Sequence, residues 1–183
     1  QRRGETDGRL IGVGFASYCE QSAHGTSVFA SWGLPLVPGY DQATVRVTPD
    51  GGLELCVGVH SHGQGMETTL AQVAHQVLGV DVARIRVVHG DTGTTPFSTG
   101  TYASRSIVMA GGAVAEACEA LVPRLLRIGA ALLACGEQEV RFDSGRVVGP
   151  AGEVSIRDVA QAWFVRPERL PKDVDRGGLE VSV

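Results

Sequence analysis

The stretch ATVRVTPDGGLELCVGV, residues 43–59, determines how the rest of this sequence can fold. Its apolar side chains alternate with polar ones on both sides of a Pro-Asp-Gly-Gly turn at residues 49–52. Alternation with a period of two indicates a strand with one buried face, and a turn of this composition between two such runs indicates a hairpin. We therefore predict an antiparallel β-hairpin with one buried face.

The sequence period changes immediately after this hairpin. From Met66, apolar residues recur at helical spacing through residue 77, and Gly79 stands where a helix would end. Residues 85–88, Ile-Arg-Val-Val, then suit a short buried strand. We expect a helix to follow the hairpin directly and a further strand to follow that helix.

The second half of the chain contains one long helical pattern and a second hairpin. Residues 104–135 are dominated by Ala, Val, Leu and Glu, and they contain Pro123. Because proline lacks an N–H and its ring clashes with the preceding turn, we expect one bent helix or two helices. Residues 138–142 and 146–148 flank an Asp-Ser-Gly turn and predict a second hairpin.

Three further segments complete the prediction. Residues 155–164 suit a short helix that is capped by Ser155, with Asp158 at the third position. Residues 9–20 are rich in strand formers and contain two glycines, so we expect a first strand packed closely against other backbone. Residues 21–39 carry Gly, Ser and Pro and are expected to be mostly loop.

The order of these elements indicates the α+β class. Strands pair in hairpins and are then followed by helices, without a repeated βαβ unit. We expect a mixed or mostly antiparallel sheet with two or three helices on one face. Residues 1–183 are predicted to form a single domain, with its core over 9–165 and a loosely ordered tail over 166–183. Because the sequence begins without methionine in a charged segment, we expect it to be part of a longer protein.

Composition excludes several functional classes. The chain has 43% hydrophobic and 20% charged residues and a formal net charge of −4, as in soluble globular proteins. It has no uninterrupted apolar run of the roughly 20 residues that span a bilayer, and no basic cluster that suits nucleic acid. The four cysteines lie far apart, and the N-terminus lacks an apolar leader. Reduced thiols and a cytoplasmic location are therefore expected.

A first candidate for chemistry is His62-Gly63-Gln64-Gly65-Met66-Glu67-Thr68-Thr69, where a strand gives way to a helix. Glycines let backbone approach a ligand, and the N–H groups of a first helical turn favour an anion such as phosphate. Gln64 adds an amide that donates and accepts. The segment lacks the lysine of a P-loop and the third glycine of a dinucleotide-binding motif. From the glycines alone, a tight strand-to-helix turn is the preferred interpretation.

The second candidate is the run from Gly90 to Ser106, which is crowded with glycine and hydroxyl side chains. These hydroxyls could hydrogen-bond a polar heterocycle or a phosphate. Ser104 or Ser106 could cap the next helix and aim its N-terminus at the same ligand. The alternative is a solvated surface loop.

Together the two segments resemble the second half of the molybdenum-cofactor-binding region in the xanthine dehydrogenase, aldehyde oxidase and carbon monoxide dehydrogenase large subunits. The resemblance runs from Arg9 to about Phe164. It is carried by GQG at 63–65 before AQVA at 71–74, GDT at 90–92 with TP at 95–96, and GTYASRS at 100–106 before GAV at 112–114. The GTYASRS variant is most similar to the bacterial carbon monoxide dehydrogenase-like branch.

The resemblance implies roles for particular residues. In that family the dithiolene sulfurs of the pterin hold molybdenum, so metal-ligating side chains are not expected and the protein orients the cofactor. Gln64 would lie near the molybdenum oxo ligand, as the catalytic candidate. The residues implied to bind cofactor are Gly63, Gln64, Gly65, Met66, Thr101, Tyr102, Ala103 and Ser104, with Ser106 as a weaker candidate.

The resemblance also implies a reaction and partners. Members hydroxylate a carbon of an aldehyde or an N-heterocycle with oxygen from water, and electrons leave through iron–sulfur and FAD partners. A bacterial member implies the cytosine dinucleotide form of molybdopterin. The family's general base is a glutamate in a Gly-Glu motif, but the pairs ending at Glu5, Glu137 and Glu153 do not match its surroundings. This chain would then supply one wall of the site, beside the remainder of the large subunit, and would be inactive alone.

Other interpretations remain open at this stage. His60 and His62, with His24, His75 or His89, could bind zinc, and Glu67 with Asp91 could form an acid/base pair. Trp32, Phe97 and Tyr102 could stack on a ring ligand. The chain could instead be a non-catalytic assembly or scaffold module, or a phosphate- or nucleotide-binding domain that uses the same two loops.

Overall fold

The computed structural model describes residues 12–35, 37–174 and 177–183. The helices are α1 (Thr26–Ser31), α2 (Met66–Leu78), α3 (Ser106–Leu132) and α4 (Ile156–Phe164). The strands are β1 (Ala43–Val47), β2 (Leu53–Val57), β3 (Ile85–Val88), β4 (Arg141–Asp143), β5 (Arg146–Gly149), β6 (Gly152–Ser155) and β7 (Glu180–Ser182).

The larger sheet has four strands in the order β3-β2-β1-β7. Strands β1 and β2 are antiparallel with Val45 opposite Leu55, which confirms the predicted hairpin. Strand β3 runs parallel to β2, with Leu55 opposite Val87. The sheet is therefore mixed, because α2 carries the chain from the end of β2 back to the start of β3.

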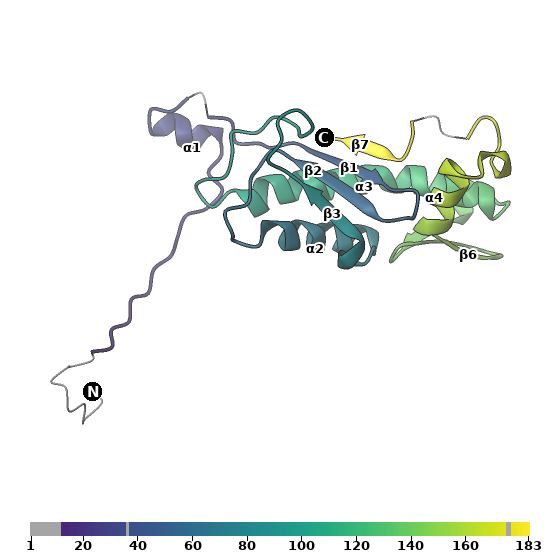
Figure 1. The fold of residues 1–183 in the computed structure, drawn as a ribbon, viewed down its shortest axis with the longest axis horizontal. Coiled ribbons are helices and arrows are strands. Elements are labelled where there is room, and N and C mark those ends of the chain that lie inside the picture. Colours follow the sequence, from purple (N-terminus) through teal and green to yellow (C-terminus); the bar gives the residue numbers. More distant parts are fainter. Residues whose placement is uncertain (1–11, 36, 175–176) are drawn as a thin grey trace.

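Helices α2 and α3 cover one face of this sheet (Figure 1). The apolar side chains of β1 and β2 point into that layer, where they meet buried residues such as Leu70 and Leu121. Charged residues, including Arg46 and Glu54, occupy the other face. The α+β class with helices on one face is confirmed, because the period-two pattern leaves only one face of the sheet to be covered.

Helix α3 is a single helix that contains Pro123 in its interior. The prediction of one or two helices is thus settled in favour of one. Its length and composition would suffice to cross a membrane. Its buried side chains, however, pack against the sheet and α2. The apolar character of α3 is accounted for by its place in the core.

The smaller sheet, β4-β5-β6, lies beside the C-terminal end of α3, together with α4 (Figure 1). The predicted second hairpin is confirmed for β4 and β5, but its first strand begins later than expected. Residues 137–139 form a 3-10 turn, in which the carboxylate of Glu139 accepts the N–H of Gly136. Strand β6 was not predicted. The α4 cap is confirmed, because Ser155 and Asp158 bond each other's backbone N–H groups.

The expected first strand is wrong for residues 12–20, which form no strand, whereas residues 9–11 lie outside the described residues. This segment extends away from the body of the fold (Figure 1), and Phe15 is 97% exposed. Strand-forming side chains make a strand only where a neighbour accepts the backbone hydrogen bonds. The expected loop at 21–39 contains the short helix α1.

The expected loosely ordered tail over 166–183 does not hold for residues 179–182, whereas residues 175 and 176 lie outside the described residues. Strand β7 pairs with β1, so that Val181 lies opposite Val45, and Leu179 is buried in the core. Pairing with an open sheet edge orders a segment whose own composition carries little signal. The core therefore extends well past residue 165.

Candidate functional site

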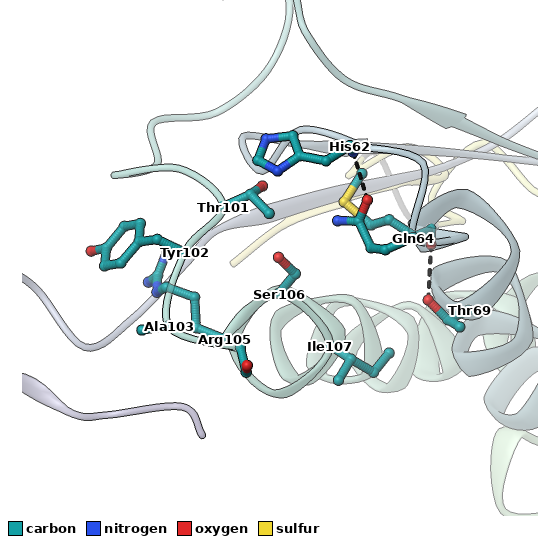
Figure 2. A pocket seen from close by; sticks show the side chains of 11 residues that line it. His62, Gln64, Thr69, Thr101, Tyr102, Ala103, Arg105, Ser106 and Ile107 are labelled. Carbon is teal, nitrogen blue, oxygen red and sulfur yellow. Dashed lines mark hydrogen bonds between the residues drawn. The ribbon is translucent and has the colours of Figure 1, made fainter. Parts of the chain in front are cut away.

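The loops at the N-terminal ends of α2 and α3 enclose one cavity of about 490 Å³. The side chains that line it come from the turn before α2, from the first turn of α2, and from the segment that enters α3 (Figure 2). They are His62, Gln64, Met66, Thr69, Thr101, Tyr102, Ala103, Ser104, Arg105, Ser106 and Ile107. Two segments far apart in sequence thus line one cavity.

The turn before α2 is built by glycine backbone. Gly65, the N-cap residue, has φ +78°. A Cβ at this position would meet nothing within 4 Å, so the positive φ, not crowding, favours glycine here. A glycine cap supplies no side-chain acceptor. The N–H of Glu67 is engaged by its own carboxylate, and the other first-turn N–H groups of α2 are left for water or a ligand.

Gln64 is held by its own turn. Its Oε1 accepts the backbone N–H of His62 at 2.5 Å. Because the oxygen is engaged in this bond, the amide nitrogen can donate to a ligand. Figure 2 shows Gln64, Thr101 and Ser106 around the same space. The local bond orients the Gln64 amide before anything binds.

The segment that enters α3 is tied to the end of β2. Thr101 Oγ1 accepts the N–H of His60 at 2.8 Å and donates to the carbonyl of the same residue at 2.7 Å. A Cβ on Gly58 would lie 2.4 Å from the carbonyl oxygen of Pro96, so only glycine permits this close approach of the loop. These contacts fix the distance between the two walls.

The capping prediction for α3 is wrong. Arg105 occupies the N-cap position, and the helix has no side-chain cap. The hydroxyl of Ser104 donates to Glu20 Oε1 at 2.6 Å, while Ser106 lies inside the first turn. Residues 103 and 104 adopt positive φ, and the Ser104 hydroxyl bonds Glu20 instead of a first-turn N–H of α3. The first N–H groups of α3 are therefore bonded by no capping side chain.

Beside the cavity, four side chains form a hydrogen-bonded chain. His89 contacts His60 through their Nδ1 atoms at 3.1 Å and Glu67 through Nε2 at 3.1 Å, and Ser61 donates to Glu67 at 2.9 Å. The N–H of Glu67's own residue, with His89 and Ser61, lowers the pKa of this carboxyl. Glu67 thus stays anionic, and its bonds to Ser61 and His89 link the start of α2 to the segments before it and after β3.

The other site hypotheses find little support. Across residues 12–35, 37–174 and 177–183, no group of three or more His, Cys, Asp or Glu side chains is placed to hold a metal ion. Glu67 bonds His89, while Asp91 accepts the N–H of Gly93 in its own turn, so the suggested acid/base pair does not form.

Of the three aromatic candidates, only Tyr102 lines the cavity. Its hydroxyl bonds Thr99 at 2.9 Å. Trp32 packs edge-on against His24 with ring centroids 4.6 Å apart, and Phe97 is exposed. The aromatic side chains therefore do not form a stacking site together.

Sequence reasoning placed Gln64, Met66, Thr101, Tyr102, Ala103, Ser104 and Ser106 in the site, and all seven line the cavity. Gly63 and Gly65 shape its rim without lining it. His62, Thr69 and Arg105 also line the cavity; they lay within the two candidate segments but were given no role, and Ile107 lay outside both segments. The binding roles themselves remain predictions.

The glutamates of two Gly-Glu pairs lie elsewhere. Glu137 pairs with Arg127 at 3.2 Å, and Glu153 pairs with Arg146 at 2.6 Å, both away from the cavity-lining set. The third pair, which ends at Glu5, falls outside the described residues.

This chain belongs to the molybdopterin cofactor-binding domain family, whose model matches residues 1–182. The resemblance to the large-subunit family is thereby confirmed. The chain is 34% identical over 173 residues to the nicotine 6-hydroxylase large subunit of Paenarthrobacter nicotinovorans, covering 93% of this chain and 21% of that protein. It is also 34% identical over 169 residues to the carbon monoxide dehydrogenase large chain of Afipia carboxidovorans, covering 91% and 20%.

Solved structures agree with these relatives. Quinoline 2-oxidoreductase from Pseudomonas putida 86 matches with a TM-score of 0.76 and 30% identity, over 90% of this chain and 21% of that one. Carbon monoxide dehydrogenase from Oligotropha carboxidovorans matches with a TM-score of 0.71 and 32% identity, over 79% of this chain and 18% of that one. The chain thus spans about a fifth of the length of the proteins it matches.

Proposed function

We propose that this chain is part of the molybdopterin-binding large subunit of a molybdenum hydroxylase, in which it supplies one wall of the cofactor site. The observation that carries the proposal is the single cavity enclosed by the Gln64 turn and the Thr101–Ser106 segment. The subunit names of the relatives support an assembly with other chains.

The residues present fit a phosphate-bearing pterin. Two helices begin at the cavity without a side-chain bond from the N-cap residue, so their first-turn N–H groups, except that of Glu67, can bind phosphate oxygens. The Gln64 amide and the Thr101 hydroxyl can hydrogen-bond the polar edge of a heterocycle. Molybdenum held by the dithiolene sulfurs of the pterin would need no protein ligand.

When bound, the cofactor would supply the oxygen-transfer and redox chemistry that hydroxylates a carbon of an aldehyde or N-heterocycle. This chain's residues would do the binding and orientation: Gln64 would direct its amide donor toward the reacting end, and Thr101 would keep the opposite wall at a fixed distance. The general base would come from the remainder of the subunit, so the chain alone would show no turnover.

The finer proposals concern the cofactor form and the setting of the enzyme. We propose the cytosine dinucleotide form of molybdopterin, iron–sulfur and FAD partners that accept the electrons, and a bacterial, cytoplasmic enzyme. The relatives named for nicotine and quinoline favour an N-heterocyclic substrate over an aldehyde.

The test is molybdenum analysis, with pterin fluorescence after oxidative release, on the lone chain and on the complex isolated through it from its own cells. We expect both signals in the complex, and a loss of most of them in Gln64→Ala but not in Gln76→Ala, a matched change on the exposed side of α2. Absence of molybdenum and pterin from both samples would overturn the proposal. A scaffold module would then be the better interpretation, or a nucleotide-binding domain if the lone chain binds nucleotides.

A further inference from the structure

Arg105 makes a set of contacts that cofactor binding alone does not explain. Its side chain is fully buried and forms an ion pair with Asp41, whose side chain is 1% exposed, with 2.9 Å between Nη1 and Oδ2. Asp41 precedes β1, whereas Arg105 precedes α3, so the pair joins segments that are distant in sequence. The pair therefore anchors the cavity wall to the base of the main sheet.

The guanidinium does more than balance this charge. Its Nη1 also donates to the carbonyl of Gly100 at 3.0 Å, and its Nη2 donates to the carbonyl of Tyr40 at 2.7 Å. Its carbon atom lies 5.3 Å from the ring centroid of Tyr102. Arg105 ends this segment, and its planar guanidinium also bonds the carbonyl of Gly100 at the start of the segment. The ring of Tyr102 lies against the guanidinium.

Burying an ion pair costs desolvation free energy that the attraction between its charges often does not recover. Burial raises the pKa of the Asp41 carboxyl, and the neighbouring Ser98 and the charge of Arg105 offset only part of this effect. Replacing such a pair by apolar side chains is often neutral or stabilising. The pair is therefore best explained by what it holds in place, not by a gain in stability.

What it holds is a strained backbone. Ala103 and Ser104 have φ values of +51° and +50°, and Gly100 has φ +105°. Non-glycine residues persist in this region only where their surroundings over-determine them, and such residues cluster at ligand sites. The N–H of Ala23 adds a bond to the carbonyl of Ala103 at 3.2 Å. Without Arg105, the carbonyl of Gly100 would lose the one side-chain hydrogen bond that it accepts in the described residues.

We propose that Arg105 and Asp41 form a positioning pair, which holds residues 100–104 in the strained conformation that binds the molybdopterin cofactor. This inference rests on the proposed function for the identity of the ligand. The positioning of the segment itself stands on the contacts above. Neither residue needs to touch the reacting atoms.

The decisive variant is the double change Asp41→Leu with Arg105→Met, made in the complex that contains this chain. A single Arg105→Met change would leave Asp41 as a buried, unpaired charge and could unfold the protein, whereas the double change removes both charges. The matched control is Arg146→Met with Glu153→Leu, which removes an exposed ion pair between β5 and β6. Arg105→Lys keeps the positive charge but not the fork.

Three quantities are measured: the thermal unfolding midpoint, amide hydrogen exchange over residues 100–106, and pterin per subunit. In the double variant we expect a midpoint modestly below wild type, because the carbonyls of Gly100 and Tyr40 lose their Arg105 donor. Exchange should be faster by about tenfold or more, and pterin should be reduced several-fold. The exchange rate and pterin content of Arg105→Lys should lie between those of wild type and of the double variant. The exposed-pair control should match wild type.

Unchanged exchange and pterin in the double variant would overturn the positioning pair. Faster exchange with full pterin content would overturn its link to the cofactor. If the wild-type complex itself carries no pterin, the proposed function fails, and the exchange comparison still decides whether the pair holds this segment.

Discussion

Thr101 and His60 exchange two hydrogen bonds, in which the Thr101 hydroxyl accepts the His60 N–H and donates to the His60 carbonyl. A side chain at the entrance of α3 thus completes the backbone bonding at the end of β2. His60 lies two residues before His62, which lines the cavity, so this contact joins the segments that carry the two walls.

The substitution Thr101→Val should loosen the cavity. It preserves the shape of the side chain but leaves both backbone groups of His60 without this partner, so the free energy of unfolding should fall by about 1 kcal/mol. Chemical denaturation measures this loss. Thr101→Ser, which keeps the hydroxyl, should behave as wild type, and equal losses in both variants would show that the methyl group matters instead.

Core packing between α2 and α3 gives a larger effect. Leu70 is fully buried, and its Cδ2 atom lies close to Gly111 of α3. Leu70→Ala should lower the free energy of unfolding by about 2–5 kcal/mol, because it leaves a cavity that this close packing cannot fill. Leu34→Ala, at an exposed position, should change it by less than about 0.5 kcal/mol. Similar values at both sites would contradict the packing described.

The α4 cap makes stability depend on pH. The hydroxyl and N–H of Ser155 lower the pKa of Asp158 below its ordinary value. Because the folded pKa is the lower one, Asp158 stabilises the fold above its unfolded pKa of about 3.9, and this stabilisation is lost as the pH falls through the folded pKa.

Asp158→Asn should therefore be less stable than wild type at neutral pH, and the difference should shrink below about pH 4. Thermal unfolding of both proteins across this range measures it. A difference that stays constant with pH would mean that the carboxylate charge plays no part in the cap.

Thiol reactivity should separate two of the cysteines. Burial, with a smaller contribution from Glu119, raises the pKa of the Cys118 thiol to about 12, whereas Cys19 is exposed. Since the thiolate is the reactive form, an alkylating reagent near pH 8 should modify Cys19 in the isolated chain and spare Cys118 until denaturant is added. Mass spectrometry of the labelled chain checks this. Early labelling of Cys118 would show that α3 opens from the sheet.

The elements predicted correctly carry their signals locally. The 43–59 hairpin, helix α2 and the capped helix α4 each depend on side chains within a few residues of one another. Strand β7 could not be found this way, because its partner β1 lies at the other end of the chain. The 12–20 segment fails for the opposite reason, since its strand-forming side chains meet no partner strand in the described residues.

In the candidate site, too, local sequence signals were predicted and contacts between distant residues were not. Glycines around Gln64 and hydroxyls from Thr101 onward marked the two walls, because turns and hydroxyl-rich loops are visible in sequence. Arg105 was part of the same motif but was not singled out. Its importance depends on Asp41, and no sequence pattern places that carboxylate beside it.

The pairing of β7 with β1 bears on the order of folding. Thr44 and Ser182, whose hydroxyls meet at 2.7 Å, are separated by 138 positions in sequence. Contacts between such distant positions form slowly, because the entropy of closing the intervening loop is lost before the contact contributes. The hairpin, α2 and β3 are near neighbours in sequence, so we expect them to assemble first. The edge strand would then be the last to dock and, in hydrogen-exchange experiments, among the first to open.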